Sequence, residues 1–147
     1  MRPLIPDTAA GSALAKAFVA QHEASLKGFD WEDPRDALAK VREEAEEVGS
    51  LLADGGAAVG DAASGRDSGA RDRRIQEEIG DLLFAVVNVA RLARVDPRPA
   101  LNRATAKFEE RFAEVERLAR LRDLPMPGTP LADLDQLWDE IKAGDRR

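Results

Sequence analysis

Two acidic clusters within helix-forming segments place the strongest constraint on how this chain can fold. They lie at residues 43–47 and 77–81. Each cluster contains a carboxylate pair three residues apart, Glu44 with Glu47 and Glu78 with Asp81. Residues at i and i+3 are neighbours on a helix surface, so each pair can point at one spot. Two such pairs facing each other offer only oxygen ligands, and these suit a hard cation such as Mg²⁺, with Mn²⁺ as a possible substitute.

Helical periodicity places these carboxylates differently with respect to the expected core. Glu44 falls inside the apolar arc of segment 34–53, Glu47 lies at the edge of that arc, and Glu78 flanks the arc of segment 74–94. The residues expected to be buried in segment 74–94 are Ile75, Ile79, Leu82, Leu83, Val86 and Ala90. A carboxylate on a core face is costly unless it has a partner. The pattern is compatible with a divalent metal and equally with buried salt bridges to lysine or arginine.

Length and composition favour a single all-α domain over residues 1–147. Alanine and leucine dominate, only 5% of residues are aromatic, and no segment has the pattern of a strand. We expect a bundle of about four to five helices, at residues 8–27, 34–53, 74–94 and 97–122, with a short helix within a C-terminal region at 123–147. Asp33 and Asp96 are expected N-caps, because each precedes a proline at the first helical position. Residues 54–73, which are rich in glycine, are expected to form a flexible surface loop.

Several classes of site and partner are excluded by the residues that are absent. The chain has no cysteine and a single histidine, His22, which excludes disulfides, zinc-thiolate sites and a multi-histidine metal site within one chain. A net charge of −6 argues against binding a nucleic acid polymer through a basic face. The chain also lacks a long apolar run and a signal pattern, so we expect a cytoplasmic protein with no membrane segment.

Basic and polar residues later in the chain are candidates for contacts to a ligand. Lys107 and Arg111, one helical turn apart, either form ion pairs with the acidic clusters or bind phosphate oxygens. Trp138 and Lys142 have the same spacing, and an indole beside an ammonium group can hold a base and its phosphates or simply belong to the core. Asn88 can hydrogen-bond a sugar or a base, or cap a buried carbonyl.

The order and identity of these motifs resemble one known family. The runs KVREEAEEV at 40–48, EEIGDLLF at 77–84, VN at 87–88 and KFEERF at 107–112 are similar to the MazG family of nucleoside triphosphate pyrophosphohydrolases. Residues 28–31 and the closing Leu137, Trp138 and Lys142 also resemble that family. The resemblance implies an all-α fold completed by dimerisation, with a tetramer possible. It also implies Mg²⁺-dependent cleavage of a nucleoside triphosphate to the monophosphate and pyrophosphate.

The resemblance also assigns roles by position. The metal ligands would be Glu44, Glu47, Glu78 and Asp81, and Glu43 would assist as an outer carboxylate or base. Lys107 and Arg111 would contact phosphates. The remaining substrate contacts would come from Gln21, Asn88, Trp138 and Lys142. This chain departs from the family in its longer glycine-rich stretch and in its first helix, where Val19, His22 and Glu23 flank Gln21 in place of the usual basic residues.

Two further functions fit the same residues. The first is a narrower pyrophosphatase for a pyrimidine nucleotide such as dUTP, or for a phosphoribosyl-ATP type substrate. The second is a catalytically silent helical binding or regulatory module in which the acidic clusters form ion pairs across a dimer.

Overall fold

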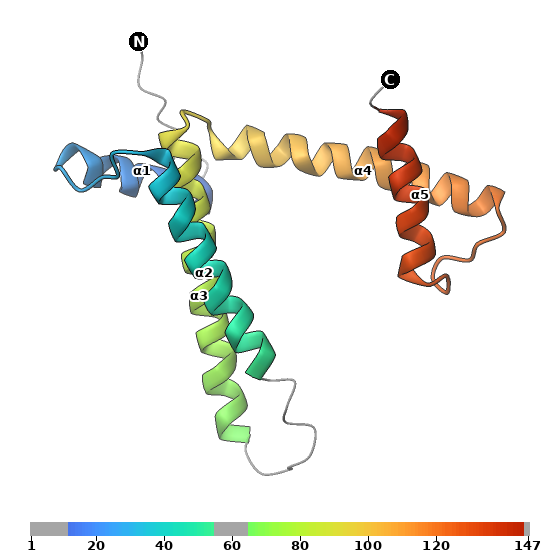
Figure 1. Cartoon of the computed structure of the whole chain (residues 1–147), viewed down its shortest axis with the longest axis horizontal. Coiled ribbons are helices and arrows are strands. Elements are labelled where there is room, and N and C mark those ends of the chain that lie inside the picture. The colour runs from blue at the N-terminus through green and yellow to red at the C-terminus, as the bar shows by residue number, and fades with distance from the viewer. Residues whose placement is uncertain (1–11, 55–64, 146–147) are drawn as a thin grey trace. The chain divides into compact units, whose positions relative to one another are not determined.

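The computed structural model describes residues 12–54 and 65–145, and this part of the chain is helical with no strand. Its helices are α1 (Ala13–Leu26), α2 (Pro34–Asp54), α3 (Gly65–Leu92), α4 (Pro97–Leu121) and α5 (Leu131–Gly144) (Figure 1). The expected all-α class is therefore confirmed. The chain divides into two compact units, Met1–Arg98 and Pro99–Arg147.

The first unit is a helical hairpin with a third helix packed against it. α2 and α3 lie side by side and run in opposite directions, and α1 packs against α3 (Figure 1). The buried side chains include Ala15, Phe18 and Gln21 of α1, Ala37, Glu44 and Leu51 of α2, and Ala85 and Val87 of α3. Two polar residues, Gln21 and Glu44, are thus buried among apolar ones. Burying a polar group costs free energy unless it is hydrogen-bonded, and burying a charged group costs more unless it is also paired with an opposite charge.

Caps begin the helices where the sequence predicts them. Asp33 Oδ1 accepts a hydrogen bond from the Arg35 backbone N–H at 2.8 Å, just before Pro34. Asp96 Oδ1 accepts one from the Arg98 backbone N–H at 3.0 Å, just before Pro97. Each carboxylate satisfies a donor that the first helical turn leaves without an intrahelical partner.

The start of α3 differs from the expected boundary. The helix begins at Gly65, so residues 65–73 are helical and not part of a loop, and residues 55–64 lie outside the described residues. A long-range contact accompanies this extra helix, because Arg71 Nη2 donates to the backbone carbonyl of Leu51 at 2.8 Å. The bond satisfies a carbonyl near the C-terminus of α2, which sequence periodicity alone does not reveal.

The expected buried arc of α3 is wrong in part for the single chain. Ile79, Leu83 and Val86 are 42%, 56% and 47% exposed. Ala85 and Val87 are buried in their place. The apolar face of this helix is wider than the surface that α1 and α2 cover, so part of it is covered by neither of these two helices.

The core of the second unit is formed by one face of α4 and one face of α5. Val115 and Ala119 pack with Leu137, and partly buried residues surround them: Leu118, Leu124, Met126, Leu134, Trp138 and Ile141. The expected amphipathic C-terminal helix is confirmed at Leu131–Gly144.

We predict that Leu137→Ala destabilises this unit by about 2–5 kcal/mol, the usual cost of deleting a buried leucine side chain. Leu137 is only 2% exposed. The matched control is Leu131→Ala in the same helix, where the leucine is 73% exposed and little contact is lost. Urea denaturation followed by circular dichroism measures both variants. Equal midpoints for the two variants would contradict the packing described above.

Candidate functional site: a carboxylate cluster beside a cavity

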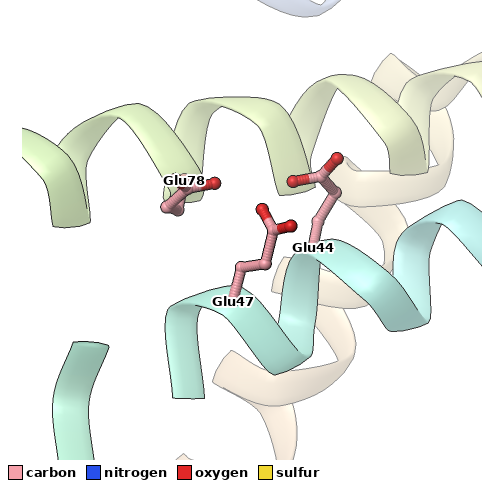
Figure 2. Close-up of side chains that lie close together, drawn as sticks. All are labelled: Glu44, Glu47 and Glu78. Atoms are coloured by element: carbon pink, nitrogen blue, oxygen red, sulfur yellow. The ribbon is translucent and has the colours of Figure 1, made fainter. Parts of the chain in front are cut away.

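Three carboxylates from two helices converge between α2 and α3. Oxygens of Glu44 and Glu47 from α2 and of Glu78 from α3 lie within 4.8 Å of one another. Figure 2 shows the three side chains pointing toward one another from facing helices. Spacing within α2 places Glu44 and Glu47 on one face, and the hairpin brings Glu78 opposite them. The structure thus brings together three of the four residues expected to bind a metal.

The fourth expected ligand, Asp81, lies one helical turn beyond Glu78 on α3. It is exposed, and it lines a cavity that Glu44 and Lys40 also line. Asp81 is therefore on the same side of the hairpin as the buried carboxylate, although it is not part of the three-residue cluster. Glu43 is exposed and projects away from the core, as periodicity predicts.

Lys40 neutralises part of the negative charge of α2. Its Nζ lies 2.6 Å from Glu44 Oε1 and 2.9 Å from Glu43 Oε1. Hydrogen bonds to Glu44 and then to Glu43 raise the pKa of Lys40 above its ordinary value, so it is a permanent cation here. Sequence reasoning did not include Lys40 among the site residues. Its spacing of four residues before Glu44 is the signal that could have identified it.

The electrostatics of the remaining pair are unfavourable. The pKa of Glu47 is raised above its ordinary value, first by a hydrogen bond with Glu78 and then by the charge of Glu78. Two carboxylates at this separation resist simultaneous ionisation unless a cation lies between them. The buried Glu44 adds a third negative group. An all-oxygen set of this kind suits a hard divalent cation.

A cavity of about 690 Å³ lies next to the cluster, within the first unit. This volume is in the range of sites for small molecules. Its lining combines the site residues Glu44, Lys40 and Asp81 with polar groups from the other helices and with an apolar wall that includes Phe84, Ala85 and Trp31. The lining of the cavity therefore combines charged groups with aromatic rings.

Residues 28–31 line one side of the cavity, and the turn that ends α1 determines their position. Gly28 has a φ of +87°, and the backbone N–H groups of Gly28 and Phe29 donate to Ser25 and Ala24 carbonyls. This left-handed conformation suits glycine and turns the chain out of the helix. The turn carries Asp30 and Trp31 to the cavity.

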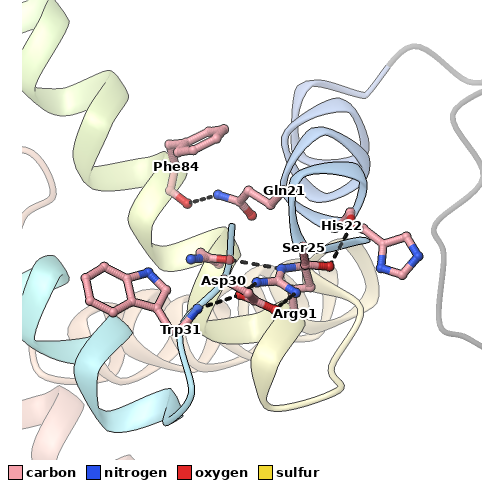
Figure 3. A network of polar contacts seen from close by, with 8 residues as sticks. Gln21, His22, Ser25, Asp30, Trp31, Phe84 and Arg91 are labelled. Carbon is pink, nitrogen blue, oxygen red and sulfur yellow. Dashed lines mark hydrogen bonds and ion pairs between the residues drawn. The ribbon is translucent and has the colours of Figure 1, made fainter. Parts of the chain in front are cut away.

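Two amide side chains also line the cavity. Gln21 of α1 is 7% exposed, and its Nε2 donates to the backbone carbonyl of Phe84 in α3 at 2.8 Å. Asn88 of α3 accepts a hydrogen bond at 2.9 Å from Arg91 Nε. Arg91 in turn contacts Asp30, and Figure 3 shows this pair together with the hydrogen bond from Gln21 to the Phe84 carbonyl. Sequence reasoning selected Gln21 and Asn88 but not Arg91 or Asp30. The Asp30–Arg91 pair has no local signal, since the two residues are 61 apart in sequence.

The other expected substrate contacts belong to the second unit. Arg111 Nε lies 2.8 Å from Asp145 Oδ2, and its guanidinium lies 6.0 Å from the centre of the Trp138 ring. Lys142 Nζ is 2.8 Å from Asp139 Oδ1, and Lys107 is exposed. Arg111, Trp138 and Lys142 thus have partners within their own unit.

The arrangement defines a class of protein, an all-helical domain with an acidic, oxygen-only cluster beside a small-molecule cavity. Residues 32–115 match the model of the MazG nucleotide pyrophosphohydrolase domain. The chain belongs to this family. The match includes the three clustered glutamates, Asp81 and Asn88, whereas Gln21 and Trp138 lie outside it.

Named relatives agree with this assignment. The chain is 37% identical over 146 residues to the nucleoside triphosphate pyrophosphohydrolase/pyrophosphatase MazG of Thermotoga maritima, covering 99% of this chain and 48% of that protein. It is 38% identical over 130 residues to the nucleoside triphosphate pyrophosphohydrolase of Escherichia coli K12, covering 88% of this chain and 44% of that protein. The chain therefore spans about half the length of these relatives. No helix in its described residues is long and apolar enough to cross a membrane.

Proposed function

We propose that this chain is a Mg²⁺-dependent nucleoside triphosphate pyrophosphohydrolase that cleaves the bond between the α- and β-phosphates. The observation that carries the proposal is the convergence of Glu44, Glu47 and Glu78 beside a cavity of about 690 Å³. Membership of the MazG family and the names of the relatives support the same reaction.

The residues present fit a divalent metal. The donors are carboxylate oxygens only, and the pKa of Glu47 is raised first by a hydrogen bond with Glu78 and then by the charge of Glu78. We propose that Glu44, Glu47 and Glu78 hold Mg²⁺, or Mn²⁺ in its place, with Asp81 as a fourth ligand. When bound, such an ion polarises phosphate oxygens and lowers the pKa of an attacking water.

The chain's own residues would then divide the remaining work. Lys40 orients the Glu44 carboxylate through the ion pair of 2.6 Å. Glu43 is proposed to accept a proton as an outer base, because it is exposed and its carboxylate is held by Lys40. Lys107 and Arg111 are proposed to bind phosphate oxygens, for which guanidinium and ammonium groups are suited. Gln21, Asn88, Trp138 and Lys142 are the proposed remaining substrate contacts.

A homodimer forms part of the proposal. Ile79, Leu83 and Val86 of α3 and Leu52 of α2 are 42–57% exposed, and apolar groups of this size are stabilised when a second surface removes them from water. We further propose a single MazG-type domain over residues 1–147 and a cytoplasmic site of action, where nucleoside triphosphates and Mg²⁺ are abundant. Light scattering after size exclusion measures the oligomeric state.

Product analysis tests the reaction directly. Purified protein is incubated with a panel of ribo- and deoxynucleoside triphosphates, dUTP included, and Mg²⁺, and the products are separated by ion exchange. We expect monophosphate and pyrophosphate in equal amounts with no diphosphate. Diphosphate with inorganic phosphate would show cleavage between the β- and γ-phosphates. No turnover with either Mg²⁺ or Mn²⁺ would reject the proposed enzymatic activity.

A further inference from the structure

A mostly buried arginine connects the loop wall of the cavity to one of the two amides that line it. The Arg91 side chain is 9% exposed. Its Nε donates to Asn88 Oδ1 at 2.9 Å, its Nη1 donates to Asp30 Oδ2 at 3.1 Å, and its Nη2 contacts Asp30 Oδ1. The guanidinium lowers the pKa of the Asp30 carboxyl, so this residue stays ionised and the ion pair persists.

Chemistry determines which way the Asn88 amide is oriented. A guanidinium has only donors, so the atom that faces Arg91 must be the carbonyl oxygen of Asn88. The NH₂ group of Asn88 then points away from Arg91, and it has no hydrogen-bond partner among the described side chains and backbone. Because Asn88 lines the cavity, it presents a free donor there.

The same reasoning determines the orientation of Gln21. The Phe84 backbone carbonyl can only accept, so the atom facing it must be Nε2 of Gln21. Gln21 Oε1 is left buried with no hydrogen-bond partner within the described residues. An unpaired buried acceptor costs free energy, and a ligand that donates a hydrogen bond to it removes that cost.

We propose that Arg91 is a positioning residue that holds Asn88 with its NH₂ toward the cavity, so that Asn88 and Gln21 offer one donor and one acceptor to the edge of a nucleobase. The proposal rests on the proposed function, and it deepens that function by naming the groups that discriminate among bases. Trp31 and Phe84, which line the same cavity, supply aromatic surface for the face of the base.

The pairing predicts discrimination that depends on orientation. A base that directs its acceptor at Asn88 and its donor at Gln21 satisfies both amides, whereas a base with the reverse order leaves both unpaired. Sites that hydrogen-bond a ligand in this way reject a mismatched group more strongly than apolar pockets reject a change in size. Freeing the Asn88 amide to rotate removes the preference for one order without removing either amide.

The test measures binding of the non-hydrolysable α,β-methylene analogues of dATP, dGTP, dCTP and dUTP by calorimetry in Mg²⁺, with tripolyphosphate as a ligand that has no base. Arg91→Lys retains a cation for Asp30 but lacks the planar set of donors that also reaches Asn88. We expect the ratio between the tightest and weakest analogue to fall by about tenfold, the scale of one hydrogen bond. The affinity for tripolyphosphate should stay within twofold of wild type. Arg35→Lys, which alters an exposed ion pair with Asp33, is the matched control.

A second variant protects the test against a folding defect. Asn88→Asp keeps an oxygen for Arg91 and replaces the donor in the cavity by an acceptor, so it should change the rank order of the four analogues. Equal affinities for all analogues in wild type, an unchanged ratio in Arg91→Lys, or an equal loss for tripolyphosphate would overturn the proposal. If Arg91→Lys does not fold, an unchanged rank order of the four analogues in Asn88→Asp would overturn the proposal. These binding data need no turnover, so failure of hydrolysis in wild type rejects the reaction separately from the role of Arg91.

Discussion

Replacing Glu44 by glutamine is expected to reduce turnover by more than about 100-fold. Mutation of a residue that only orients a metal ligand commonly lowers metal affinity or activity by about 10–100-fold, so loss of a direct ligand should cost at least as much. Glu44 is the buried member of the cluster, 5% exposed, and contributes an oxygen within 4.8 Å of Glu47 and Glu78. A neutral amide keeps the size of the side chain but removes the charge that a divalent ion requires. Initial rates with a saturating nucleoside triphosphate and Mg²⁺ measure the effect.

The fold of the Glu44→Gln variant should be preserved. The amide oxygen can still accept a hydrogen bond from Lys40, whose Nζ lies 2.6 Å from Glu44 Oε1 in the wild-type chain. Removing one of three clustered negative groups also relieves repulsion. Glu46→Gln is the matched control, since Glu46 lies on the same helix, is exposed and is not in the cluster. Glu44→Gln activity within a few-fold of this control would show that Glu44 is not a ligand.

Mg²⁺ is expected to raise the melting temperature of the wild-type chain, and Glu47→Gln should abolish most of that increase. A ligand that binds only the native state at a hundredfold excess over its Kd stabilises that state by about 2.7 kcal/mol. The stabilisation depends on the carboxylates that the folded hairpin brings together and that the unfolded chain keeps apart. Differential scanning calorimetry with and without Mg²⁺, for wild type, Glu47→Gln and Glu46→Gln, measures it. Equal shifts in all three proteins would place the ion elsewhere.

The same series has an expected pH dependence in the absence of metal. The pKa of Glu47 is raised from 4.5 because Glu78 hydrogen-bonds it and repels its charge. The folded state therefore binds the Glu47 proton more tightly than the unfolded state does. The stabilisation that this proton contributes is fully present below the pKa of Glu47 in the unfolded chain, and it is lost as pH rises through the pKa in the folded protein. In EDTA, the wild-type melting temperature should fall relative to Glu47→Gln as pH increases from about 4 to 7. A constant difference across this range would contradict the coupling of Glu47 to Glu78.

Much of the helical architecture follows from local sequence. Apolar periodicity and the proline-preceding caps at Asp33 and Asp96 act within one or two helical turns, so they locate α2 and α4 closely. The predicted start of α3 at residue 74 is wrong, because the glycine content of the preceding residues suggests a loop whereas the helix begins at Gly65. The contact of Arg71 with the Leu51 carbonyl lies across the hairpin and has no signal in the local sequence. Periodicity also could not decide which apolar face of α3 the other helices cover, since that depends on how many helices pack against it.

The sequence by itself determined the helical class, the family and the carboxylate pairs, because helix spacing places i and i+3 residues on one face wherever the helix lies. Only the tertiary structure decided that Glu78 lies beside Glu44 and Glu47, and that Glu44 is the buried member of this cluster. It also decided that Gln21 and Arg91 line the same cavity. Gln21 meets the Phe84 carbonyl 63 residues away, and Arg91 meets Asp30 61 residues away. Such contacts depend on how whole helices pack, and packing is the sum of many small contacts that no single stretch of sequence contains.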